Sequence, residues 1–173
     1  MDIFEAMALR RSSRAYTAEK VSAEELEKLL FAANSAPVGG AHYENIHLTV
    51  VQEPALREQL RAAGAGANSS ADPFYGAPLV ILVSARARQS SPGVEIANAA
   101  CLVEHMHLAA TALGLGSVYI WGCLPGLRAD AALKTRLGIP DGFEPLSAIA
   151  VGHVAEAPAP RTFDGQYACD LFL

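Results

Sequence analysis

The sequence predicts either an α+β fold or a three-layer α/β/α fold, and three observations lead to this prediction. Hydrophobic patterns and turn residues alternate in the order helix, helix, strand, helix, strand, helix, strand, helix, strand. Residues 77–85 form a continuous apolar run, which is typical of a strand buried on both faces. Hydrophobic residues make up 51% of the chain and charged residues only 18%, a balance that favours an obligate oligomer.

The first half of the chain is expected to hold three helices and one strand. Residues 2–10 carry an imperfect apolar face and predict a short amphipathic helix. Ser22-Ala-Glu-Glu25 is a capping box that starts a second helix. Residues 35–45 contain a proline and two glycines, so we expect a loop before the strand at 46–51. Pro54 opens a third helix that ends near Ala63, because proline is tolerated in a first turn.

The second half continues this alternation of helices and strands. After a small, polar loop at 64–76, the expected elements are strand 77–85, helix 94–114, strand 117–121, helix 128–137 and strand 145–154. Gly114 and Gly116 are expected to close the long helix in left-handed conformations, and Gly138 to close the next one. No linker divides the chain, so residues 1–173 are expected to form a single domain. Residues 155–173 end in aromatic and aliphatic side chains, and we expect this C-terminal arm to pack on a partner subunit.

Composition excludes several classes of protein. The net charge of −5 argues against nucleic acid as a partner, because phosphate binding requires a basic face. Cys101, Cys123 and Cys169 are odd in number and widely spaced, which indicates a reducing, cytoplasmic compartment. Asp2 and Glu5 stand where a signal peptide would be basic. The longest apolar stretch, 96–115, is interrupted by polar side chains, so no membrane span is expected.

Three stretches are candidates for chemistry. Arg10, Arg11, Ser12 and Arg14 form a dense donor cluster that suits a phosphate group, or else a solvated helix end favoured by the helix dipole. Gly39 and its glycine neighbour permit a close backbone approach to a flat ligand, or an ordinary turn. The pair Trp121-Gly122 offers an exposed amide beside a stacking surface, unless the tryptophan belongs to the core.

Other chemistries find less support in the sequence. Cys101, His105 and His107 share part of the long helix, but nothing completes a set of three or four metal ligands, so no metal is expected. We interpret them as a polar patch in the middle of the helix at a subunit interface. No G-x-S-x-G elbow indicates a hydrolase, and no G-x-G-x-x-G follows a strand.

Taken together, the motifs resemble the FMN-dependent nitroreductase family over nearly the whole chain. They occur in the order RRSSR, then AP-x-GG before a strand, a long helix that leads into ALGLGS-x-x-I-x-G, then GIPDG, a strand that ends in VGH, and Pro-x-Pro-Arg161. This resemblance implies a three-layer α/β/α fold around a mostly antiparallel sheet, in an obligate homodimer. It also implies bound FMN and NAD(P)H as the electron donor.

The resemblance also implies roles for individual residues. Arg10 and Ser12 match phosphate ligands, Arg161 completes that pocket, and Arg11 lies within the same motif. Arg14 matches a cation near flavin N1 and O2, where it would stabilise the negative charge of the reduced ring. Pro37, Val38 and Gly39 match a loop that reaches the flavin from the other subunit. Trp121 and Gly122 match positions beside N5, where the backbone of Gly122 would support hydride transfer, and Asn68 matches a side chain at the ring edge.

No side chain is assigned as a dedicated acid or base. The loop that begins at Pro37 reads PVGGAHYEN, which looks more like a Gly-Gly-x-His subgroup of a short family member and makes His42 and Tyr43 candidate substrate contacts. The expected activity is ping-pong hydride transfer from NAD(P)H through N5 to nitroaromatics, quinones or similar small-molecule acceptors. The alternatives are an FMN-dependent oxidase or dehydrogenase of a specialised substrate, and a flavin-binding module without efficient turnover.

Overall fold

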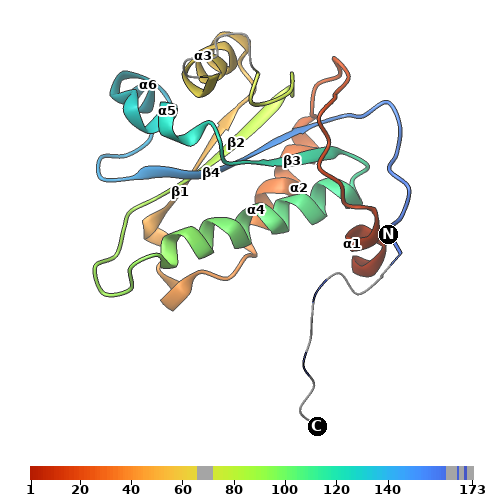
Figure 1. The fold of residues 1–173 in the computed structure, drawn as a ribbon, viewed down its shortest axis with the longest axis horizontal. Coiled ribbons are helices and arrows are strands. Elements are labelled where there is room, and N and C mark those ends of the chain that lie inside the picture. Colours follow the sequence, from red (N-terminus) through yellow and green to blue (C-terminus); the bar gives the residue numbers. More distant parts are fainter. Residues whose placement is uncertain (66–71, 163–166, 168–169, 171–173) are drawn as a thin grey trace.

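Four antiparallel strands form the central sheet in the computed structural model, which describes residues 1–65, 72–162, 167 and 170 (Figure 1). The strands are β1 (Ile46–Val51), β2 (Leu79–Ala85), β3 (Gly116–Ile120) and β4 (Glu144–Gly152), in the spatial order β1-β2-β4-β3. Every residue of β2 is buried, as its continuous apolar run predicts. All three strand pairs are antiparallel, which confirms the expected kind of sheet.

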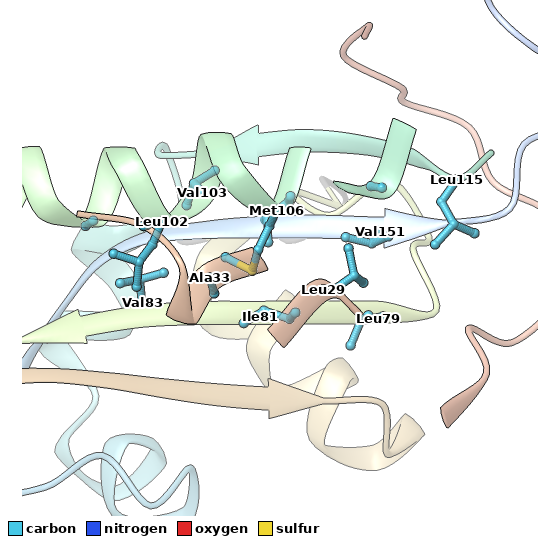
Figure 2. Packing of buried hydrophobic residues seen from close by; sticks show 14 of the residues in the cluster. Leu29, Ala33, Leu79, Ile81, Val83, Leu102, Val103, Met106, Leu115 and Val151 are labelled. Carbon is cyan, nitrogen blue, oxygen red and sulfur yellow. The ribbon is translucent and has the colours of Figure 1, made fainter. Parts of the chain in front are cut away.

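Helices cover both faces of this sheet, so the fold has three layers (Figure 1). One face carries α1 (Ile3–Leu9), α2 (Ala23–Asn34) and α4 (Val94–Ala112), and the other carries α3 (Pro54–Ala65), α5 (Leu124–Ala129) and α6 (Ala131–Arg136). Two separate apolar clusters fill the spaces between the layers. In the first, Leu29 of α2 and Met106 of α4 meet Ile81 of β2 (Figure 2).

Local signals explain where the first helices begin. The backbone N–H of Glu25 donates to the Ser22 hydroxyl at 3.2 Å, and the carboxylate of Glu25 accepts from the Ser22 N–H at 2.7 Å. This reciprocal pair confirms the predicted capping box. Asp2 and Glu5 form a second capping box at α1 that the sequence analysis did not identify.

The single helix predicted at 128–137 is wrong, because the structure has two short helices there. Asp130 interrupts the helix: its carboxylate accepts a hydrogen bond from the Leu133 N–H at 2.8 Å and so caps α6. The preceding helix, α5, packs directly on α3. A Cβ added at Gly126 would overlap the carbonyl oxygen of Ala63, so this helix contact requires glycine.

A second correction concerns the end of α4. Gly114 takes the expected positive φ of 77°, but Gly116 does not, since it is the first residue of β3. Its role is to permit close packing. A Cβ at Gly116 would lie 2.7 Å from the hydroxyl oxygen of Ser13, so the absence of a side chain lets the N-terminal segment pass over the strand.

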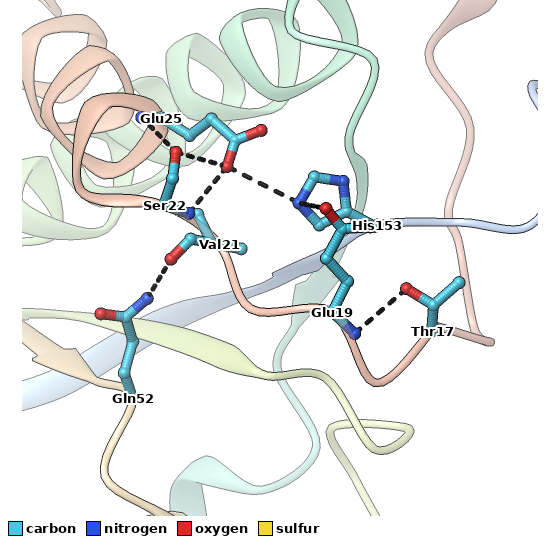
Figure 3. Close-up of polar contacts among 7 residues, drawn as sticks. All are labelled: Thr17, Glu19, Val21, Ser22, Glu25, Gln52 and His153. Atoms are coloured by element: carbon cyan, nitrogen blue, oxygen red, sulfur yellow. Dashed lines mark hydrogen bonds and ion pairs between the residues drawn. The ribbon is translucent and has the colours of Figure 1, made fainter.

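Residues 10–17 cross the start of β3 and reach the end of β4. Ser12 forms a parallel bridge with Ser117, and the Ser13 N–H donates to the Ser117 carbonyl at 2.9 Å. The Thr17 N–H donates to the carbonyl of His153 at 2.8 Å. Close to this point, the carboxylate of Glu25 lies 3.6 Å from the His153 ring (Figure 3). The segment between α1 and α2 is therefore held at both ends.

The first part of the C-terminal segment packs against α1 of the same chain. The Arg161 N–H donates to the carbonyl of Ala8 at 2.9 Å, so residues 155–161 lie beside α1. Leu171, Phe172 and Leu173 lie outside the described residues, and their packing on a partner stays a prediction. Within the described part of the chain, no helix combines the length and the apolar character that a bilayer span requires.

Replacing Gly126 with alanine should destabilise the protein by about 1–3 kcal/mol, because α5 must move away from the carbonyl of Ala63. Urea unfolding followed by circular dichroism measures this change. Gly122→Ala is the matched control, since nothing lies within 4 Å of a Cβ at that position, and its effect should stay within about 0.5 kcal/mol. Equal stabilities for the two variants would contradict the packing described for α3 and α5.

Candidate functional site

Three arginines from the two ends of the chain meet at the C-terminal end of α1. A guanidinium nitrogen of Arg161 donates to the carbonyl of Arg10 at 2.8 Å, although 151 residues separate them. The guanidinium of Arg11 donates to the carbonyls of Ala8 at 2.9 Å and Ala159 at 2.7 Å. The structure therefore brings together Arg10, Arg11 and Arg161, three of the residues predicted to bind a phosphate.

This arginine cluster (Arg10, Arg11 and Arg161) carries positive charge that no described carboxylate neutralises. None of the ion pairs found among the described residues includes any of the three. The pKa of Arg11 is lowered by partial desolvation and then by the charges of Arg161 and Arg10. Mutual repulsion of this kind is relieved when an anion binds between the cations.

The residues of this region differ in how many of their hydrogen-bond donors are already used within the chain. The Arg11 guanidinium donates hydrogen bonds to backbone carbonyls and so holds the C-terminal segment against α1. The guanidinium of Arg10 and the hydroxyl of Ser12 make no hydrogen bond to another described residue. Arg10 and Ser12 therefore have donors available to a ligand, and Arg161 keeps the N–H groups that its one bond to Arg10 does not use.

A buried histidine links this region to the core. His107 is only 2% exposed, and its Nδ1 lies 2.7 Å from the hydroxyl oxygen of Ser117. Burial, and next the charge of Arg10, lower the pKa of His107 to about 4, so the ring is neutral at physiological pH. The interpretation of His107 as part of an interface patch is wrong, because the ring faces β3. His105 and Cys101 lie on the more exposed side of α4, where the His105 ring is 2.9 Å from the Cys101 carbonyl.

Arg14 lies beyond the β3 crossing and contacts an aromatic ring. Its guanidinium carbon is 5.8 Å from the centre of the Tyr75 ring, within the range of a cation–π interaction. Sequence reasoning missed Tyr75. The available signal was the short FYG turn before a buried strand, which places an aromatic side chain near the start of that strand.

Trp121 and Gly122 follow the end of β3 at Ile120. Trp121 is 51% exposed and lies 6.5 Å, centre to centre, from the Tyr119 ring. Most tryptophans are largely buried, so this side chain provides an accessible flat surface. Gly122 has open space where a side chain would lie. Asn68 lies outside the described residues.

The loop that contains Pro37, Val38 and Gly39 is fastened to the first half of α4. The Gly39 N–H donates to the side chain of Asn98 at 2.9 Å, and Arg88 donates to the Gly39 carbonyl at 3.1 Å. Gly40 has the positive φ of 68° that a glycine permits. After it, His42 is half-buried and Tyr43 is exposed, and the His42 ring lies 2.9 Å from the Glu44 carboxylate.

One chain does not bring this loop to the arginine cluster. The loop is held at Asn98 and Arg10 acts on His107, nine residues further along α4, which corresponds to about 13 Å along a helix. Within one chain, the loop and the arginine cluster therefore lie beside different halves of α4. Among the described residues, no group of three or more His, Cys, Asp or Glu side chains is arranged to hold a metal ion.

Comparison with known proteins places this geometry in context. Residues 7–153 match the Nitroreductase family. A protein of Archaeoglobus fulgidus with the provisional name NADH dehydrogenase/NAD(P)H nitroreductase is 28% identical over 144 residues, which are 83% of this chain and 80% of that protein. A crystal structure of a Bacteroides fragilis nitroreductase with bound FMN superposes with a TM-score of 0.80 at 28% identity, covering 99% of this chain and 100% of that one. A crystal structure of a nitroreductase family protein of Clostridium difficile superposes with a TM-score of 0.70 at 30% identity, covering 92% of this chain and 88% of that one.

The buried His107 should make stability depend on pH between about 6.5 and 4. The unfolded chain binds a proton near pH 6.5 whereas the native ring binds it only near pH 4, so stability should fall as the pH is lowered, by up to about 1.4 kcal/mol per pH unit. Urea unfolding at several pH values measures the slope. His107→Asn should flatten it, and His105→Asn should leave it in place. An unchanged slope in His107→Asn would assign the effect to other groups.

Proposed function

This chain belongs to the nitroreductase family, and we propose that it is an FMN-dependent oxidoreductase that takes electrons from NADH or NADPH. Nitroaromatics, quinones or similar conjugated molecules are its acceptors. The related proteins described above support the cofactor and the donor. The observation that carries the proposal is the gathering of Arg10, Arg11 and Arg161 at the end of α1, where no carboxylate of the described residues pairs with them.

The residues present fit the phosphate of FMN. Arg10 has an unused guanidinium and Ser12 an unused hydroxyl, and both belong to a segment fixed on β3. Guanidinium groups bind phosphate oxygens in pairs of hydrogen bonds. Arg161 adds charge from the other end of the chain, while Arg11 holds that end in place. A phosphate would relieve the repulsion among the three cations.

The residues near the far end of this segment suit the ring system. FMN would supply the chemistry of hydride transfer at its N5 atom when it is bound here. Arg14 would hold positive charge near N1 and O2, where negative charge develops during this transfer. Trp121 would offer a face for stacking, and the backbone of Gly122, which has open space beside it, would lie near N5. The protein thus contributes binding, orientation and a fixed charge, and the proposed order of events is ping-pong, with donor and acceptor using one site in turn.

A homodimer would complete the site. The outward face of α4 carries small and apolar residues, among them Ala97, Ala100 and Leu108. Beside it, α1 leaves large apolar side chains uncovered, with Phe4 77% exposed and Ile3 50% exposed. Apolar surface of this kind is typical of obligate interfaces. Pairing two copies through α4 would bring the Pro37–Gly39 loop of one chain toward the arginine cluster of the other and place the arm 155–173 against the partner.

Purified protein should take up FMN, and Arg10→Ala should weaken this binding by about 10-fold or more, because a charge-assisted hydrogen bond is lost. Quenching of flavin fluorescence during titration measures the dissociation constant. Arg136→Ala, which removes an exposed arginine of α6, should bind FMN like the parent protein.

Turnover provides a second test of the same proposal. NADH or NADPH oxidation should proceed with menadione as the acceptor. Bound flavin that neither nicotinamide reduces would favour the oxidase or the flavin-binding module instead. Protein that takes up no FMN would overturn the assignment.

The assembly can be tested separately. Analytical ultracentrifugation should give twice the chain mass of 18.2 kDa. Ala100→Arg, on the outward face of α4, should shift the protein toward single chains and weaken FMN binding, because a buried charge disfavours the interface. Ala132→Arg adds the same side chain to an exposed position of α6 and should change neither property. A parent protein that sediments as a single chain while it binds FMN would contradict the proposed dimer.

A further inference from the structure

We propose that Tyr75 is a positioning residue that holds the Arg14 guanidinium at the ring-binding side of the site. This inference rests on the proposed function, since it assigns Arg14 to the flavin ring. Tyr75 itself does not need to touch the cofactor. Its role would be to fix where the positive charge of Arg14 lies.

The turn that carries Tyr75 is firmly held. The Asp72 carboxylate accepts hydrogen bonds from the N–H groups of Phe74 at 2.9 Å and Gly76 at 2.6 Å. Phe74 is only 4% exposed and anchors the turn in the core. On the other side, Arg57 donates to the carbonyl of Ala77 at 3.0 Å. A side chain placed on this turn therefore has a defined position.

Tyr75 is an unusual residue for its place in the turn. Its φ of 57° lies in the left-handed region, where a side chain is unfavourable and glycine is preferred. The following residue, Gly76, has a similar φ of 72°. The strain is not offset by burial, because the tyrosine is 39% exposed. Strained residues of this kind often serve a site.

The contact with Arg14 supplies a reason for the aromatic ring. Arg14 forms no ion pair with any described carboxylate, so the π face of Tyr75, 5.8 Å away, is the attraction that the structure offers to its charge. The single proton of the Tyr16 hydroxyl is shared between the carbonyls of Ser13 at 2.8 Å and Ala150 at 3.3 Å. These bonds fix the backbone just before Arg14, while Tyr75 restrains the end of its side chain.

A ring partner has a chemical advantage over a carboxylate here. A carboxylate would neutralise Arg14 and remove its value for a negative charge on the ligand. An aromatic face attracts the guanidinium and leaves its net charge intact. The arrangement therefore restrains the cation and keeps it available.

The test is the midpoint potential of bound FMN, because a misplaced Arg14 would weaken binding of the reduced form more than the oxidised form. Tyr75→Leu removes the ring and should lower the affinity for reduced FMN, relative to that for oxidised FMN, three- to tenfold. This change makes the two-electron potential about 15–30 mV more negative. Tyr75→Phe keeps the ring and should retain the parent potential. Should the leucine variant fail to fold, Tyr75→Gly removes the ring and also relieves the left-handed strain.

A double-mutant cycle separates positioning from a merely structural role. In an Arg14→Gln background, Tyr75→Leu should have no further effect on the potential. A shift that persists without Arg14, or equal potentials in Tyr75→Leu and the parent, would overturn the inference while leaving the proposed function in place. A parent protein that binds no FMN would overturn both.

Discussion

The hydrogen-bonded crossing of residues 10–17 over β3 determines where the candidate ligand groups lie. Ser12 and Ser13 are fixed on Ser117, and Thr17 is fixed on His153 at the other end of the crossing. The crossing is possible because Gly116 presents no side chain to Ser13. Segments outside regular elements are usually mobile, but this one is held at two points and can present guanidinium groups at defined positions.

The different roles of the three arginines follow from the same crossing. The Arg11 guanidinium donates to backbone carbonyls from both ends of the chain and so joins them. That contact keeps Arg161 beside Arg10, where neither has a described counter-ion. Three like charges in one place oppose folding, so the cluster is unfavourable for the protein alone and becomes favourable once an anion binds. A solvated helix end would need no such arrangement of arginines from both termini.

Local patterns made most of the fold predictable. The capping box at Ser22, the buried strand β2 and the long helix α4 each follow from residues close in sequence. The break at Asp130 could not be predicted in this way, because an apolar periodicity continues across it and only the side-chain cap reveals two helices. For the site, the arginines were visible as a motif. The neutral His107 and the ring of Tyr75 were not, since their contacts join segments that are distant in the chain.

The length of α4 connects the proposed site with the proposed dimer. Asn98, which binds the glycine loop, and His107, which senses the charge of Arg10, lie nine residues apart on α4, or about 13 Å along the helix. An antiparallel second copy would place the first half of one α4 beside the second half of the other. Each site would then draw on both chains, and FMN would act as a ligand of the dimer alone. By mass action, a cofactor that binds only the dimer stabilises it, so occupancy and assembly would rise together with protein concentration. The small side chains on the outward face of α4 would allow the two helices to approach closely enough for this coupling.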